Sequence, residues 1–194
     1  MLRWFEKEPG AEWKTAEEGL IDIPKALDSL DLVEPCPDVE DFCLNPDFRS
    51  WWHDRMTAVD GDGDRVAAIG SMLDVDPSAI SMNQYGSAAV VVRYENRQVG
   101  QWESDAALVA DVAADQVLSE WDDTWTELDP VNRSRILNSL RMFLERCPSC
   151  GGPASLGQET VESCCREMEV AAVSCSECGE RLFEVELEES FDGG

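Results

Sequence analysis

Two short runs, Cys147-Pro-Ser-Cys150-Gly-Gly and Cys175-Ser-Glu-Cys178-Gly-Glu, decide the fold of the last quarter of this chain. Within each run, the two cysteines are spaced so that one tight turn can direct both sulfurs at the same ion. The glycine after the second cysteine lets the backbone wrap around the sulfur. Together, the two runs predict one tetrahedral metal site made of Cys147, Cys150, Cys175 and Cys178.

This metal site is expected to be structural, because four protein thiolates leave no open position for water or substrate. The expected cofactor is one Zn²⁺ ion. A rubredoxin-like iron site would use the same ligands. A further alternative is that the four cysteines form a redox pair or disulfides instead of a metal site.

Residues 147–188, which contain both cysteine runs, resemble the zinc ribbon family. Residues 169–175 and 181–188 have strand character, and the second run alternates apolar with acidic residues. The resemblance implies two strands that pair across the second cysteine turn. It also implies docking on a partner, because zinc ribbons commonly occur in transcription, translation and other assemblies.

The chain is strongly acidic: its 41 Asp and Glu residues against 15 Lys and Arg residues give a net charge of -26, spread along the whole sequence. Lysine is scarce and does not occur after Lys25. This composition resembles that of intracellular proteins of extremely halophilic archaea, whose charge is screened by molar salt, where the Debye length is about 3 Å. The alternative is that the acidic surface mimics or repels nucleic acid.

The sequence contains no run of 18 apolar residues, and its start lacks the pattern of a signal peptide. We therefore expect a cytoplasmic protein with no membrane contact. No nucleophile triad, phosphate loop or dinucleotide fingerprint occurs, and one histidine leaves little for acid and base chemistry, so we do not expect an enzyme.

The pattern of helices and strands predicts an α+β fold, with a mainly helical central domain that carries a β-hairpin, followed by a C-terminal β zinc ribbon. The expected parts are a Pro-rich arm (1–45), the central domain (46–146) and the ribbon (147–190). Helices are predicted over 47–59 and 65–73, after the cap residue Ser104, and from Asp129-Pro130 to 146; residues 88–94 and 97–103 form the hairpin. Trp4 and Trp13 in the arm are candidate partner-binding residues, unless they fill the core of their own domain.

Residues 69–80 resemble the helix-turn-helix family, because Ile69, Gly70, Leu73, Val75 and Ile80 have the spacing of its buried contacts. The resemblance implies a winged helix in which the hairpin is the wing and residues 77–85 form the recognition helix. Ser81, Asn83 and Gln84 would then face DNA. The sequence departs from the family where Asp74 replaces the turn glycine, and residues 77–85 contain no Lys or Arg.

Two weaker patterns remain. One is a second metal site, with Cys36, Cys43, His53 and one of Cys164 and Cys165 as its ligands. None of these pairs has the spacing of the two cysteine runs, and the alternative is that these cysteines are small buried residues. The acidic residues 60–64 resemble a calcium loop only superficially, since Arg65 and Ser71 occupy the positions that require Gly and Glu.

The leading functional hypothesis is a non-enzymatic zinc-ribbon interaction protein of an extreme halophile or its virus, docking on a macromolecular partner or assembly. A winged-helix DNA-binding transcriptional regulator is one alternative, with nucleic acid as partner. A structural component of a larger particle, such as a virion, is the other.

Overall fold

The computed structural model describes residues 19–61, 65–85, 89–163 and 166–187, and it confirms the predicted α+β fold. In chain order, the helical elements are α1 (Ile23–Ser29), α2 (Pro46–Gly61), α3 (Arg65–Leu73), η1 (Pro77–Ala79), α4 (Asp105–Trp121), η2 (Asp123–Glu127), α5 (Pro130–Leu140) and η3 (Arg141–Phe143). The strands are β1 (Val33–Pro35), β2 (Phe42–Leu44), β3 (Ile80–Tyr85), β4 (Ala89–Tyr94), β5 (Arg97–Trp102), β6 (Ala154–Ser163), β7 (Arg166–Cys175) and β8 (Arg181–Glu186).

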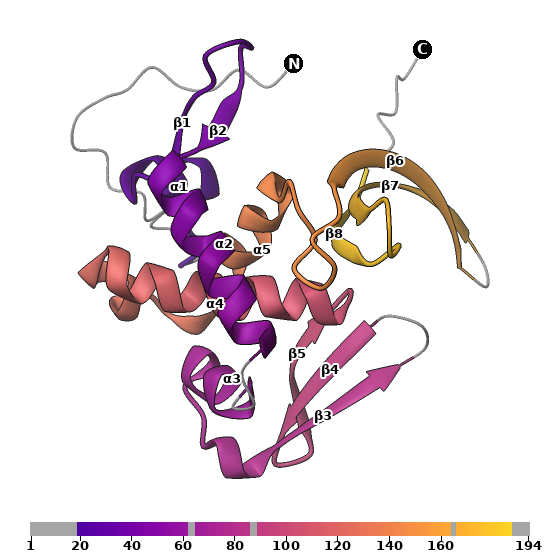
Figure 1. The fold of residues 1–194 in the computed structure, drawn as a ribbon. Helices are drawn as coiled ribbons and strands as arrows, with labels where there is room; N and C mark the ends of the chain where they lie inside the picture. The colour runs from indigo at the N-terminus through magenta and orange to yellow at the C-terminus, as the bar shows by residue number, and fades with distance from the viewer. Residues whose placement is uncertain (1–18, 62–64, 86–88, 164–165, 188–194) are drawn as a thin grey trace.

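Helix α4 is the centre of the molecule. It begins at the predicted cap residue Ser104, whose hydroxyl accepts a hydrogen bond from Ala107 N. Apolar residues cover nearly its whole circumference, as expected of a helix that is packed on all sides. Helix α2 crosses it, the sheet β3–β4–β5 lies beside it, and the last three strands adjoin its N-terminal end (Figure 1).

Three tryptophans fix the packing around α4 through their indole N–H groups. Trp52 of α2 donates to the Ala110 carbonyl at 2.9 Å. Trp102 of β5 donates to Asp111 at 2.7 Å, and Trp125 of η2 donates to Asp115 at 2.9 Å. The two carboxylates are buried because each satisfies an indole that would otherwise lack an acceptor.

The described part of the expected N-terminal arm, residues 19–45, packs into the core of the central domain. Its buried residues include Ile21, Leu27, Leu30, Leu32 and Leu44. Asn132 and Arg135 of α5 bind the backbone N–H and carbonyl of Ile21 at 3.0 Å and 2.9 Å. The prolines of this segment interrupt its helices, but they do not prevent the burial of its apolar side chains. Trp4 and Trp13 lie outside the described residues.

The recognition helix predicted by the helix-turn-helix resemblance does not form. Helix α3 is present, but residues 77–85 make one 3₁₀ turn followed by strand β3. The run from Ile80 to Asn83 alternates apolar and polar side chains, and the whole strand to Tyr85 pairs with β4 in an unbroken antiparallel register. Asp74 adopts the left-handed conformation, with φ of 55°, in the place of the expected turn glycine.

The hairpin β4–β5 and the start of α5 at Pro130, capped by Asp129, agree with the sequence prediction. Helix α5, however, ends at Leu140 rather than at residue 146. A 3₁₀ turn follows, and Arg146 then forms a β-bridge with Pro153. The extended segment places the first cysteine run against the neighbouring strands.

Candidate metal centre

The four predicted ligands come together in one cluster. The sulfurs of Cys147, Cys150, Cys175 and Cys178 all lie within 4.8 Å of one another. The Sγ atoms of Cys147 and Cys178 are 3.7 Å apart, and those of Cys150 and Cys175 are 3.4 Å apart. A tetrahedral Zn²⁺ site with metal–sulfur distances of about 2.3 Å has sulfur–sulfur edges of about 3.8 Å. The cluster therefore has the size and donor set of a four-thiolate metal site.

The two cysteine turns share one backbone hydrogen-bonding pattern. Gly151 N donates to the Cys147 carbonyl at 2.9 Å, and Gly179 N donates to the Cys175 carbonyl at 3.0 Å. Both glycines have positive φ, 73° and 76°, which explains why glycine follows the second cysteine of each run. The sequence repeat is thus a repeat of the backbone turn.

The environment of the thiols differs between the inner and outer sides of the cluster. Cys147 and Cys175 are buried, whereas Cys150 and Cys178 are exposed. Burial raises the pKa of Cys147. At Cys175, burial acts in the same direction, but the backbone N–H groups of Cys178 and Glu177, together with the thiols of Cys150 and Cys178, outweigh it and lower the pKa to about 7. A bound cation would favour the thiolate form of all four groups.

Three strands carry the cluster. As predicted, β7 and β8 pair across the second cysteine turn, and β6 is an addition to the two predicted strands. Cys175 ends β7 and lies opposite Ala154 at the start of β6. The sheet therefore holds the two cysteine turns against each other from one side.

Glu180, which directly follows the second cysteine turn, attaches the cysteine cluster to the central helix. Its carboxylate accepts hydrogen bonds from Ala106 N in the first turn of α4 and from the Ser149 hydroxyl of the first cysteine turn, both at 3.1 Å. Negative charge is favourable at the N-terminus of a helix. One side chain therefore joins both cysteine turns to α4.

Arg141 forms the second attachment, and it is almost completely buried. It donates to the Leu182 carbonyl of β8 at 2.7 Å and pairs with Glu103. Its Nε also lies 3.1 Å from Asp111 Oδ1, an ion-pair contact without hydrogen-bond alignment. Burial raises the pKa of Asp111 to about 6, although the charge of Arg141 and the hydrogen bond from Trp102 act in the opposite direction.

The second metal site considered for Cys36 and Cys43 is wrong. These two residues form a disulfide across the β1–β2 hairpin, between the residue that follows β1 and the middle residue of β2, with their Cα atoms 5.1 Å apart. Hairpin pairing brings them within bridging distance. His53 lies on α2 with an exposed side chain, and Cys164 and Cys165 are outside the described residues.

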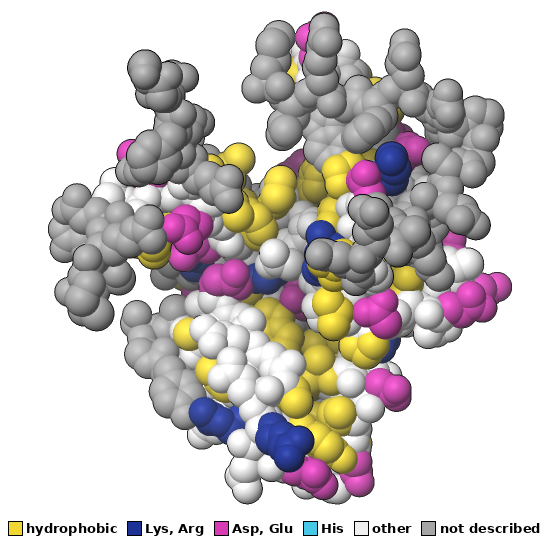
Figure 2. Space-filling view, turned by 180° about the vertical axis from the view of Figure 1, so that it is seen from behind, with side chains coloured by type: hydrophobic (Ala, Val, Ile, Leu, Met, Phe, Trp, Pro, Cys, Tyr) yellow, Lys and Arg dark blue, Asp and Glu magenta, His cyan; other side chains and the backbone are white. Residues whose placement is uncertain are grey.

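Ser81, Asn83 and Gln84 lie on strand β3 and are exposed. The register places Ser81 and Asn83 opposite Arg93 and Val91, on the face turned away from the core residues Val90 and Val92. Residues 80–102 contain a single carboxylate, that of Glu95, although Asp and Glu make up 41 of the 194 residues. Figure 2 shows mostly uncharged side chains in the lower part of the molecule, which contains this sheet. Sheet β3–β4–β5 is thus an acid-poor surface.

Together, the fold and the cysteine cluster define an α+β protein whose small C-terminal cysteine module is fixed to a helical central domain. The chain belongs to the Family of unknown function (DUF8054): the central domain of that family matches residues 22–142, and its C-terminal domain matches residues 145–185. No curated protein and no solved structure matches the chain. In the described part of the chain, no helix is both long and apolar enough to span a bilayer.

Proposed function

We propose that this chain is a non-enzymatic interaction protein whose C-terminal module, fixed by zinc, docks on a protein partner in a salt-rich cell. The observation that carries the proposal is a pair of exposed apolar side chains on the two outer strands of the module, Leu156 and Val185, here called the apolar strip. Leu156 of β6 is 63% exposed and Val185 of β8 is 46% exposed. A leucine exposed to this extent on a rigid module is typical of a contact surface.

The strip is continuous with the core of the molecule. Leu156 lies opposite the buried Val173, and Val185 lies opposite Ala171 on the same face of β7. Phe183, also opposite Val173, is buried. A partner that covers Leu156 and Val185 would extend an apolar layer that already exists.

Zinc is the ion we assign to the cluster, because four thiolates in a closed tetrahedron suit a structural Zn²⁺ site. The ion would hold the two cysteine turns together and would leave no position for a substrate. The acid-poor surface on β3–β4–β5 supports a docking role too, since dense carboxylates elsewhere would have to lose water to bind a partner.

The zinc assignment is tested with protein purified in molar KCl without added metal. We expect close to one zinc ion per chain by elemental analysis. Cys175→Ser should lose the ion and unfold the module, because metal binding and folding of such a site are one equilibrium. Iron in place of zinc, or substoichiometric metal with disulfides among the four cysteines, would contradict the assignment.

The docking surface is tested by co-purification from lysate of the source cells in molar KCl. Leu156→Asp and Val185→Asp should abolish retention of a stoichiometric protein partner while metal content stays at one ion per chain. Val131→Asp is the matched control, because Val131 on α5 is 59% exposed and lies outside the strip. Equal retention by all variants, or capture of nucleic acid instead of protein, would refute the proposal.

A further inference from the structure

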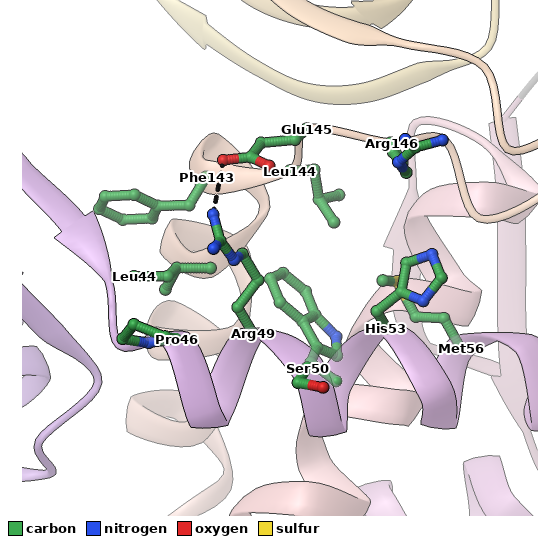
Figure 3. Close-up of a pocket in the computed structure, with 11 residues that line it drawn as sticks. Leu44, Pro46, Arg49, Ser50, His53, Met56, Phe143, Leu144, Glu145 and Arg146 are labelled. Atoms are coloured by element: carbon green, nitrogen blue, oxygen red, sulfur yellow. Dashed lines mark hydrogen bonds and ion pairs between the residues drawn. The ribbon is translucent and has the colours of Figure 1, made fainter.

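A pocket of about 370 Å³ lies between α2 and the segment that leads from η3 to the first cysteine turn. It is separate from the apolar strip, and its volume is within the ordinary range for small-molecule sites. The residues that line it are Leu44, Pro46, Arg49, Ser50, Trp52, His53, Met56, Phe143, Leu144, Glu145 and Arg146 (Figure 3).

The floor of the pocket is apolar and fixed. Leu44, Trp52, Met56 and Leu144 are all buried core residues. The indole of Trp52 is held by its hydrogen bond to the Ala110 carbonyl. Such a floor suits the apolar body of a ligand, which it would remove from water without rearrangement of the core.

At the rim of the pocket, basic side chains outnumber acidic ones, whereas acidic side chains outnumber basic ones in the chain as a whole. Arg49 and Arg146 stand against one carboxylate, that of Glu145, and His53, the single histidine of the sequence, adds an imidazole. Glu145 accepts from Arg49 at 3.0 Å. Across the whole chain, acidic residues outnumber Lys and Arg by 41 to 15. An anion repelled by most of this surface would therefore find an opposite charge at this rim.

Arg146 and His53 lie at one end of the pocket, and an apolar group lies at the other. Figure 3 shows His53 and Arg146 near each other at one end, with Phe143 at the opposite end. Arg146 carries five N–H donors, and its contact with the Gly151 carbonyl, at 3.5 Å, uses one of them. His53 Nδ1 lies 3.9 Å from Asp54, and both side chains are exposed. A planar guanidinium matches the two oxygens of a carboxylate.

We propose that this pocket binds a small amphipathic carboxylate. The carboxylate lies at the end formed by Arg146 and His53, and the apolar body covers Trp52 and Leu144. This site is distinct from the partner surface proposed above and does not depend on it.

The probe is potassium octanoate, titrated into the metal-loaded full-length chain in molar KCl and followed by calorimetry. The imidazole proton signals of His53 give a second readout by NMR, since no other histidine contributes to them. We expect one saturable site per chain. Octanol and octyltrimethylammonium, whose apolar chain is one methylene longer and which lack the carboxylate, should bind at least about ten-fold more weakly, a difference of about 1.4 kcal/mol.

Three variants locate the site. Arg146→Gln should weaken the binding of octanoate about ten-fold. Ser50→Trp should block binding, because the larger side chain fills the pocket without changing its charge. Arg97→Gln, at the start of β5, makes the same change in net charge away from the pocket and should leave the affinity unchanged. Because Arg146 adjoins Cys147, metal content is measured for each variant; if Arg146→Gln loses the ion, His53→Gln takes its place.

The proposal is overturned if octanoate shows no saturable binding or if octanol binds equally well. It is also overturned if Arg97→Gln weakens binding as much as Arg146→Gln, because the effect would then come from net charge alone.

Discussion

Replacing Arg141 with methionine should destabilise the whole chain, because this side chain joins the central domain to the C-terminal module. Its guanidinium contacts Asp111 of α4, Glu103 after β5 and the Leu182 carbonyl of β8. Methionine fills similar space but donates no hydrogen bond. The substitution therefore leaves a buried carboxylate and a buried carbonyl without their cationic partner.

The magnitude follows from burial. The side chains of Arg141 and Asp111 are only 4% and 7% exposed, so solvent cannot replace the lost contact. Removing one partner of a buried ion pair costs about 3–5 kcal/mol, a large part of the 5–15 kcal/mol that stabilises a typical domain. Since the pair is buried, molar salt should reduce this loss very little.

Chemical denaturation in molar KCl, followed by tryptophan fluorescence, measures the loss. Arg49→Met is the control, because Arg49 and Glu145 form an ion pair with side chains 51% and 71% exposed, worth at most about 1 kcal/mol. Asp111→Asn should recover part of the loss in the Arg141→Met background, since a neutral amide does not need a cation. A loss below about 1 kcal/mol, or no coupling between the two sites, would refute this account of Arg141.

Three further predictions concern charge, pH and the N-terminus. The melting temperature should rise as KCl increases from about 0.1 M to molar levels, because salt screens a net charge of -26; a salt-independent melting temperature would show that the composition has been misinterpreted. The pKa of Asp111 is raised from 3.8 to about 6, so its stabilising contribution is complete below about pH 4 and is lost as pH rises through about 6. The free energy of unfolding should therefore rise as pH falls from 7 to 5. In the Asp111→Asn variant, which lacks this titrating group, the free energy of unfolding should rise less over the same range. Trp4→Ala and Trp13→Ala should weaken retention of the partner without lowering the melting temperature; a lower melting temperature in the absence of partner would place these tryptophans in the core.

Local signals in the sequence predicted the parts of the fold that depend on neighbouring residues. The paired cysteines and their glycines specify two turns whose geometry is complete within six residues each. Ser104 and Asp129 mark the starts of α4 and α5 because a cap acts on the first helical turn alone.

Residues 77–85 show where local spacing failed. The spacing of apolar residues from Ile69 to Ile80 fits two helices, and α3 does form. Beyond Pro77, the alternation from Ile80 to Asn83 has the period of a strand, and the long-range pairing of β3 with β4 satisfies its backbone. Tertiary pairing outweighed the helical pattern, so the three residues expected to face DNA lie on a sheet.

The buried acids of α4 were hidden by the composition itself. In a chain with 41 acidic residues, Asp111 and Asp115 read as part of a solvated surface. The signal that could have found them is the tryptophan content, because every buried indole requires an acceptor. Trp102 and Trp125 donate hydrogen bonds to these two carboxylates. A buried carboxylate also requires a cation. Arg141 lies 3.1 Å from Asp111, and Arg133 lies 3.8 Å from Asp115. Trp102 and Trp125 thus explain why Asp111 and Asp115 lie in the core instead of on the surface, each with an arginine beside it.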